Sequence, residues 1–137
     1  PYVQRVYKSG IMPGVQKKYA DKVVWLSVNS THPEHQDFET AEDLDKTYKE
    51  WKATFATMLL DPDGNVGRMY DAKTTPHMYI IDKEGKLVYA GAIDDDPRGK
   101  NSEKTNYVDA ALTSMFEGKA VATTNTRSYG CTIKYAP

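Results

Sequence analysis

The chain has 137 residues, of which 18 are basic and 19 acidic, so its formal net charge at pH 7 is −1. This balance gives no electrostatic reason to expect a nucleic acid or an anionic membrane as partner. The apolar runs are far shorter than the roughly 18 residues of a membrane-spanning helix, so we predict no membrane span. A single cysteine excludes an internal disulfide and a thiolate metal cage. We expect one soluble α/β domain over residues 1–137.

The N-terminal part predicts a helix followed by a strand. Residues 1–22 carry apolar side chains at helical spacing, and Pro1 suits the first helical turn. Gly10 and Pro13-Gly14 are expected to kink or split this helix. The short, mostly β-branched run 23–29 predicts a strand that is buried on both faces, as in a parallel sheet.

The middle of the chain predicts an alternation of helices and strands. A polar loop over residues 30–39 precedes a capped amphipathic helix over residues 40–52. Residues 57–60 predict a second strand, which the Pro-Gly turn of residues 61–64 ends. A single short helix over residues 66–70 follows.

The C-terminal half predicts a hairpin, a helix and a tail. Strands over residues 78–82 and 87–91 flank a tight turn, which is typical of an antiparallel hairpin. Residues 106–117 place apolar side chains on one helical face. Residues 119–137 predict an extended polar tail, which carries the one cysteine.

This order of elements, with Thr75-Pro76 ahead of the Ile80-Ile81-Asp82 hairpin, resembles the thioredoxin-like family. The similarity is to its alkyl-hydroperoxide-reductase/thiol-specific-antioxidant and thiol-disulfide oxidoreductase branches, the redoxins. Residues 1–7 and 129–135 also resemble one subgroup, in which a Cys-Pro-Phe/Tyr-Val motif opens the first helix and a Tyr-Gly-Cys segment ends the protein. The resemblance extends over essentially the whole chain. It implies a thioredoxin-like fold, with a mixed sheet flanked by helices and a redoxin-type insertion.

The same resemblance implies a nucleophilic cysteine immediately before Pro1, preceded by the central strand of the sheet. We therefore expect a further N-terminal segment ahead of Pro1. A thiolate at that place would be stabilised by the N-terminus of the helix. Cys131 is the candidate resolving thiol, and its polar setting suggests a mobile segment that can reach a distant sulfur. An inert, packed cysteine is the alternative.

Thr75-Pro76 is the predicted cis-proline loop. In the family that it resembles, the backbone before the proline faces the catalytic sulfur and pairs with an extended substrate. His77 and Tyr2 are candidate substrate contacts beside it. An ordinary trans proline and a structural histidine are the alternatives.

Three acidic or histidine-containing segments are weak metal candidates. The loop from His32 to Asp37 holds two histidines and two acids, but a solvated loop is favoured over a metal site. Residues 61–65 match only part of a calcium-loop pattern and indicate a turn. Asp94-Asp95-Asp96 indicates a charged loop after the last strand, with a cation site as the minor alternative.

Three functions remain open at this point. The first is a thiol-dependent oxidoreductase that reduces a peroxide or a protein or small-molecule disulfide, with a thioredoxin-like reductant and no cofactor. The second is a binding module that keeps the cis-proline groove without redox chemistry, and the third a metal-handling protein. We favour the first. The resemblance fits both cytoplasmic and exported proteins, so it leaves the compartment open.

Overall fold

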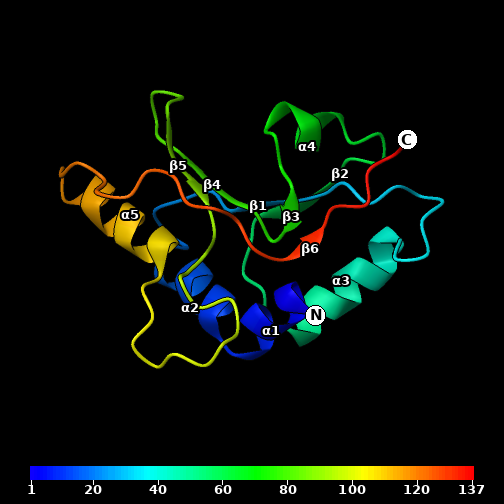
Figure 1. Ribbon diagram of the computed structural model, residues 1–137, viewed down its shortest axis with the longest axis horizontal. Coiled ribbons are helices and arrows are strands. Elements are labelled where there is room, and N and C mark those ends of the chain that lie inside the picture. The colour runs from blue at the N-terminus through cyan, green and yellow to red at the C-terminus, as the bar shows by residue number, and fades with distance from the viewer. The chain divides into compact units, whose positions relative to one another are not determined.

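The computed structural model describes all residues 1–137 and shows a mixed α/β protein with five helices and three two-stranded sheets (Figure 1). The chain forms two compact units. The first unit comprises Pro1–Tyr2 and Thr74–Cys131, and the second comprises Val3–Lys73 and Thr132–Pro137. None of the helices has the length and hydropathy that crossing a membrane would require.

The N-terminal helical region is split once, into α1 (Tyr2–Lys8) and α2 (Ile11–Lys18). The break at Gly10 was predicted and is confirmed, because this residue adopts φ 84°. The predicted second break at Pro13-Gly14 is wrong. Pro13 lies in the first turn of α2, where a backbone N–H has no partner inside the helix and its absence does no harm.

The second unit contains the parallel pair β1 (Leu26–Asn29) and β2 (Thr57–Leu60), with Leu26 opposite Thr57. The prediction that the first strand belongs to a parallel sheet is confirmed, because its pairing with β2 is parallel. The prediction that the first strand is buried on both faces is wrong, because Leu26 and Val28 are 51% and 43% exposed. Side chains alternate between the two faces of a strand, and only the other face of β1 packs against the protein.

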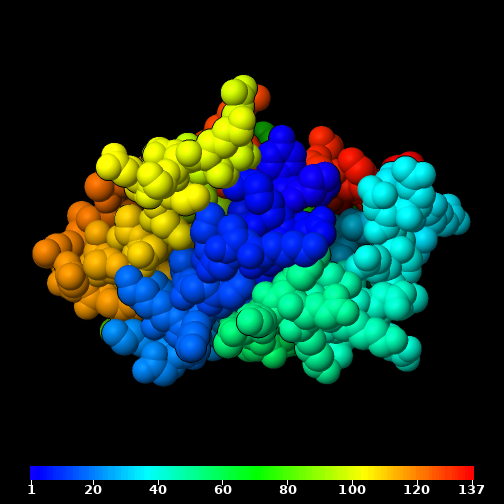
Figure 2. All heavy atoms as spheres, turned by 90° about the horizontal axis from the view of Figure 1, so that it is seen from below, coloured from blue at the N-terminus to red at the C-terminus, as the bar shows by residue number.

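Aromatic side chains join α1 to α3 (Ala41–Glu50), the predicted capped helix, in the core of the second unit. The ring centroid of Tyr7 lies 5.2 Å from that of Tyr48 and 5.5 Å from that of Trp51. Burial raises the pKa of Tyr48 to about 12. Figure 2 shows the N-terminal helices, in blue, directly beside this later segment, in green. This region is therefore a packed core.

Asp61 organises the start of α4 (Asn65–Met69). Its carboxylate accepts hydrogen bonds from the Ser30 hydroxyl (2.6 Å) and from the backbone N–H groups of Val66 (3.2 Å) and Gly67 (2.9 Å). Burial by itself raises the pKa of this carboxyl, but the hydrogen bonds outweigh burial and hold the pKa below its ordinary value. The aspartate that matched the calcium pattern thus stabilises a helix N-terminus.

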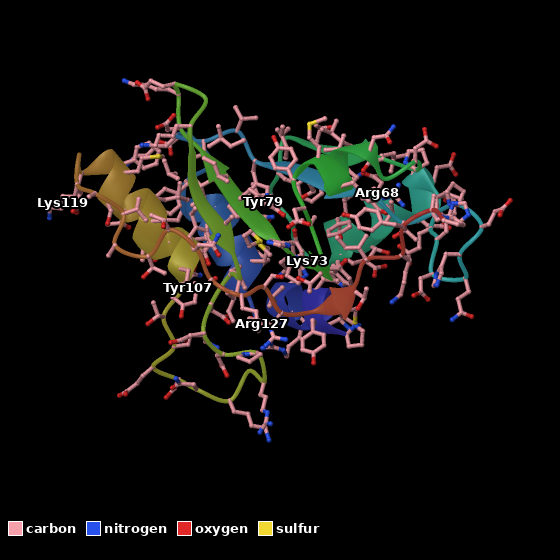
Figure 3. All side chains as sticks on the ribbon, turned by 45° about the horizontal axis from the view of Figure 1, so that its top comes forward. Arg68, Lys73, Tyr79, Tyr107, Lys119 and Arg127 are labelled. Atoms are coloured by element: carbon pink, nitrogen blue, oxygen red, sulfur yellow. The ribbon has the colours of Figure 1, made fainter.

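The end of the chain is also fixed in the second unit. The backbone N–H of Ile133 donates to the carbonyl of Lys73 (3.1 Å), and the Tyr135 hydroxyl donates to the carbonyl of Ala72 (2.7 Å). The Arg68 guanidinium lies 4.9 Å from the centre of the Tyr135 ring. The labels of Arg68 and Lys73 mark this region in Figure 3.

The first unit is built on the predicted hairpin of β4 (Met78–Ile81) and β5 (Leu87–Gly91), an antiparallel pair. Helix α5 (Tyr107–Phe116) contacts both strands, and Asn106 caps it as the acceptor of the Asp109 N–H (2.9 Å). The buried apolar side chains of this unit come from these elements and the segment after β5. They are Ile80, Tyr89, Ala92, Ile93, Val108, Ala111 and Leu112.

Candidate functional site

The candidate site is built around a short strand pair in which β3 (Thr74–Thr75) pairs with β6 (Cys131–Thr132). The Thr75–Pro76 peptide bond is cis, as predicted. The Thr74 hydroxyl donates a hydrogen bond to the Pro76 carbonyl at 2.8 Å, which fixes the loop after β3. Cys131 is a free, half-buried thiol at the start of β6.

Gly130 allows the closest approach of the tail to β3. It adopts φ 148°, and a Cβ atom at this position would overlap the carbonyl oxygen of Thr75. A side chain there would therefore push the tail away from the loop. The glycine next to Cys131 is what places the thiol segment against Thr75-Pro76.

The tail upstream of this glycine is extended, as predicted, and lies against β5. The N–H of Thr126 donates to the carbonyl of Ala90 (3.1 Å), and the Thr126 hydroxyl accepts from the N–H of Ala92 (2.9 Å). The hydroxyl oxygens of Thr126 and Tyr89 lie 2.6 Å apart, and burial raises the pKa of Tyr89. Figure 3 labels Arg127, the next residue, on this segment. Backbone and side-chain hydrogen bonds of Thr126 thus hold the tail upstream of the thiol against β5.

Tyr129 connects the tail to two further parts of the first unit. Its hydroxyl donates to Oδ1 of Asp94 at 2.5 Å. Its ring centroid lies 6.1 Å from that of Tyr2, with the ring planes tilted by 60°. Tyr2 is the first residue of α1 and directly follows Pro1, so one tyrosine contacts both the start of the helix and a buried carboxylate.

In the predicted charged loop at Asp94-Asp95-Asp96, two of the three aspartates are buried. Asp95 is exposed, whereas Asp94 and Asp96 are 1% and 5% exposed. Both oxygens of Asp96 have partners, which include the Lys104 ammonium at 3.2 Å. Burial alone raises the pKa of Asp96, but these donors hold it below its ordinary value. Oδ1 of Asp94 also accepts the Asp96 N–H (3.0 Å), but its Oδ2 is buried without any hydrogen-bond partner.

The residues predicted for the site all belong to the first unit. Pro1 is exposed, and Tyr2 is partly exposed. His77 is half-buried and stacks on Tyr79, with ring centroids 4.7 Å apart. The full set is Pro1, Tyr2, Thr75, Pro76, His77 and Cys131.

In the histidine loop of the second unit, the backbone N–H of His32 donates to the carbonyl of Lys134 (2.8 Å), and the two imidazoles lie beside neighbouring acids. His32 lies 3.4 Å from the Glu34 carboxylate, and His35 lies 3.7 Å from that of Asp37. The structure contains no group of three or more histidine, cysteine, aspartate or glutamate side chains that could hold a metal ion.

Sequence reasoning did not identify Asp94 and Tyr129 as partners. Their contact spans 35 residues, and no local periodicity or motif reports a contact at that separation. One signal in the sequence could have indicated that Asp94 is buried. Asp94 directly follows the apolar pair Ala92-Ile93, and both of these residues are buried. Chemically, the arrangement combines a half-buried thiol, a backbone edge and a buried carboxylate in one unit.

The protein is therefore a mixed α/β protein with a thiol beside a cis-proline loop, and comparisons assign its family. The chain belongs to the DUF6436 family, a domain of unknown function, whose model matches residues 11–134. It is similar to an uncharacterized conserved protein from Geobacillus kaustophilus (TM-score 0.86, 31% identity), covering 100% of this chain and 72% of that one. It is also similar to a hypothetical protein from Sinorhizobium meliloti (TM-score 0.86, 29% identity), covering 99% of this chain and 74% of that one. None of the curated proteins matches the chain.

Proposed function

We propose that this protein is a thiol-dependent oxidoreductase of the redoxin type, with a thioredoxin-like fold. In this proposal a cysteine directly precedes Pro1 in the full-length protein and is the nucleophile. Cys131 is the resolving thiol, and Thr75 and Pro76 bind the substrate backbone. The substrate is a peroxide or a disulfide, and the reductant is an external dithiol.

The observation that carries the proposal is the pairing of β6 with β3. This pairing places Cys131 beside the Thr75-Pro76 loop, in the unit that also contains Pro1 and Tyr2. Gly130 supports this placement, because the absence of a side chain lets the segment before Cys131 approach the Thr75 carbonyl closely. The parallel β1–β2 pair, the antiparallel β4–β5 hairpin and the helices between them support the thioredoxin-like fold.

The proposed reaction with a peroxide has three balanced steps. The nucleophilic thiolate attacks ROOH, breaks the O–O bond and, with one proton, yields a sulfenic acid and ROH. The Cys131 thiol then attacks the sulfenic sulfur, forms a disulfide and releases water. An external dithiol reduces this disulfide and becomes oxidised itself. With a disulfide substrate, the first product is a mixed disulfide, and attack by Cys131 releases the second substrate thiol.

The test uses the full-length protein with dithiothreitol and either hydrogen peroxide or an oxidised small-molecule disulfide. We expect steady thiol consumption, and we expect Cys131→Ser to reduce turnover at least about tenfold, since only the resolving step is removed. The matched control is Thr132→Ser, a change of similar size at the exposed neighbour of Cys131 on β6. Its turnover is expected to equal that of the wild type.

Equal turnover in Cys131→Ser and wild type would remove Cys131 from the mechanism. No thiol consumption with either oxidant would overturn the redox proposal and leave the binding module. In that case peptide binding at the Thr75-Pro76 edge would become the next measurement.

A further inference from the structure

Asp94 is a buried acid that the proposed chemistry does not use. Its side chain is 1% exposed, and Oδ2 has no hydrogen-bond partner. Almost every buried polar atom in a folded protein is paired, so an unpaired carboxylate oxygen in the core requires an explanation. Stability alone does not supply one, because an apolar residue of similar size would avoid the burial of a charge.

The position of Asp94 is rigidly defined by its neighbours in the chain. It forms an antiparallel bridge with Asn106, the residue that caps α5. The carbonyl of the preceding residue, Ile93, accepts the N–H of Tyr107 at 2.8 Å. The carboxylate is thus a fixed point next to the start of α5, which Tyr107 marks in Figure 3.

The side chain that donates a hydrogen bond to this carboxylate is that of Tyr129, which lies two residues before Cys131. The Tyr129 hydroxyl donates to Oδ1 at 2.5 Å, a short and charge-assisted type of hydrogen bond. The tail is further held at Gly130 by its contact with Thr75. Asp94 and Thr75 therefore hold two successive residues, Tyr129 and Gly130, immediately before the thiol.

We propose that Asp94 is a positioning residue that acts through Tyr129 to set the place of Cys131 beside the Thr75-Pro76 loop. The proposal rests on the proposed function, in which Cys131 must meet a sulfur bound near that loop. Tyr129 also packs on Tyr2, the first residue of α1, so the same side chain relates the thiol segment to the helix start. The carboxylate acts only as a hydrogen-bond acceptor and takes no part in bond making or breaking.

The test compares four variants of the full-length protein: Asp94→Asn, Tyr129→Phe, the double variant and the control Asp95→Asn. Asp95 is the exposed neighbour of Asp94 and accepts the Thr105 N–H (2.8 Å), so its variant makes the same chemical change without touching Tyr129. The first readout is the rate at which iodoacetamide alkylates Cys131 in the folded protein. The second is the separation of kcat from KM in thiol consumption.

We expect Asp94→Asn and Tyr129→Phe each to raise the alkylation rate about fivefold or more, because loosening the segment exposes the thiol. The alkylation rate of the double variant should not exceed that of Tyr129→Phe, since Asp94→Asn weakens the same hydrogen bond that Tyr129→Phe removes. Asp95→Asn should stay within about twofold of the wild type. In turnover, kcat and KM for the peroxide should fall together and leave kcat/KM unchanged, because the resolving step follows the oxidation of the nucleophile.

Alkylation rates equal to the wild type in both single variants would overturn the proposal, as would a double variant whose effect is the product of the two. Should Asp94→Asn fail to fold, Tyr129→Phe decides, because it removes a single oxygen atom. Alkylation does not depend on turnover, so a protein without thiol consumption would fail the proposed function and still give a result for Asp94 and Tyr129.

Discussion

Each of the two compact units contains a buried aspartate, and the two carboxylates differ in how completely they are paired. Asp61 in the second unit accepts three hydrogen bonds, one from the Ser30 hydroxyl and two from backbone N–H groups of α4. Asp94 in the first unit accepts two on one oxygen and none on the other. Burial is similar, at 7% and 1% exposed, so pairing is what separates them.

This difference in pairing distinguishes a carboxylate that stabilises the fold from one that positions another residue. In a fully paired acid, the hydrogen bonds offset the cost of desolvating the carboxylate and fix the local backbone, here the start of α4. A half-paired acid contributes little net stability, which leaves its link to Tyr129 as the reason for its presence. The comparison therefore predicts large stability effects at Asp61 and small ones at Asp94.

The largest effect is expected from Asp61→Ala. Its removal leaves the buried Ser30 hydroxyl and the N–H of Gly67 without an acceptor, which should lower the free energy of unfolding by about 3 kcal/mol. Urea unfolding measures the change. The control Asp63→Ala, at an exposed position in the same turn, should change it by less than about 0.5 kcal/mol. Similar losses in the two variants would mean that Asp61 is not the anchor of α4.

Gly130→Ala should have the next largest effect on stability. It tests whether the close backbone contact with Thr75 holds the tail in the first unit. The added Cβ would overlap the Thr75 carbonyl, so we expect a loss of about 2 kcal/mol or more. The control Gly85→Ala shares a positive φ but has open space around it, and should cost only about 1 kcal/mol. Equal losses would show that the contact with Thr75 is not a tight one.

A smaller difference is expected in the response to acid. The pKa of Asp61 is lower in the folded than in the unfolded state, so its contribution is present above the unfolded pKa of about 3.9 and is lost as pH falls through the folded pKa. Unfolding free energies between pH 6 and pH 2 should therefore fall less steeply for Asp61→Asn than for the wild type. The remaining slope includes Asp96, whose pKa is also lowered. Parallel curves would contradict the pairing assigned to Asp61.

The smallest effect on stability is expected from Asp94→Asn. The amide weakens the hydrogen bond from Tyr129 but also removes a buried charge, and because these two effects offset each other the free energy of unfolding should change by less than about 1 kcal/mol. Thermal and urea unfolding both measure this. A loss above about 2 kcal/mol would place Asp94 with Asp61 as a structural acid and erase the distinction between them.

Local patterns in the sequence predicted most of the elements but not their partners. The hairpin of β4 and β5, the cap at Thr40 and the break at Gly10 depend on neighbouring residues, and all three are confirmed. The exposure of Leu26 and the burial of Asp94 depend on which distant segments pack beside them. A single sequence gives no information on such contacts.

The candidate site likewise has features that a local motif predicted and contacts that no local motif predicted. Thr75-Pro76 carries a local motif, and its predicted cis bond is present. The contacts of the tail with Ala90 and Thr75 join segments that are far apart in the chain, so no local pattern predicted them. The redox role of Cys131 stays a prediction.

Disulfide mapping of the full-length protein determines whether Cys131 forms a disulfide in a catalytic cycle. The reduced protein is treated with one equivalent of hydrogen peroxide, alkylated while folded, digested and analysed by mass spectrometry. We expect a disulfide that joins the peptide containing Cys131 to the peptide containing the residue before Pro1, and we expect it to disappear on reduction. Recovery of Cys131 only as the alkylated thiol after oxidation would exclude the proposed resolving role.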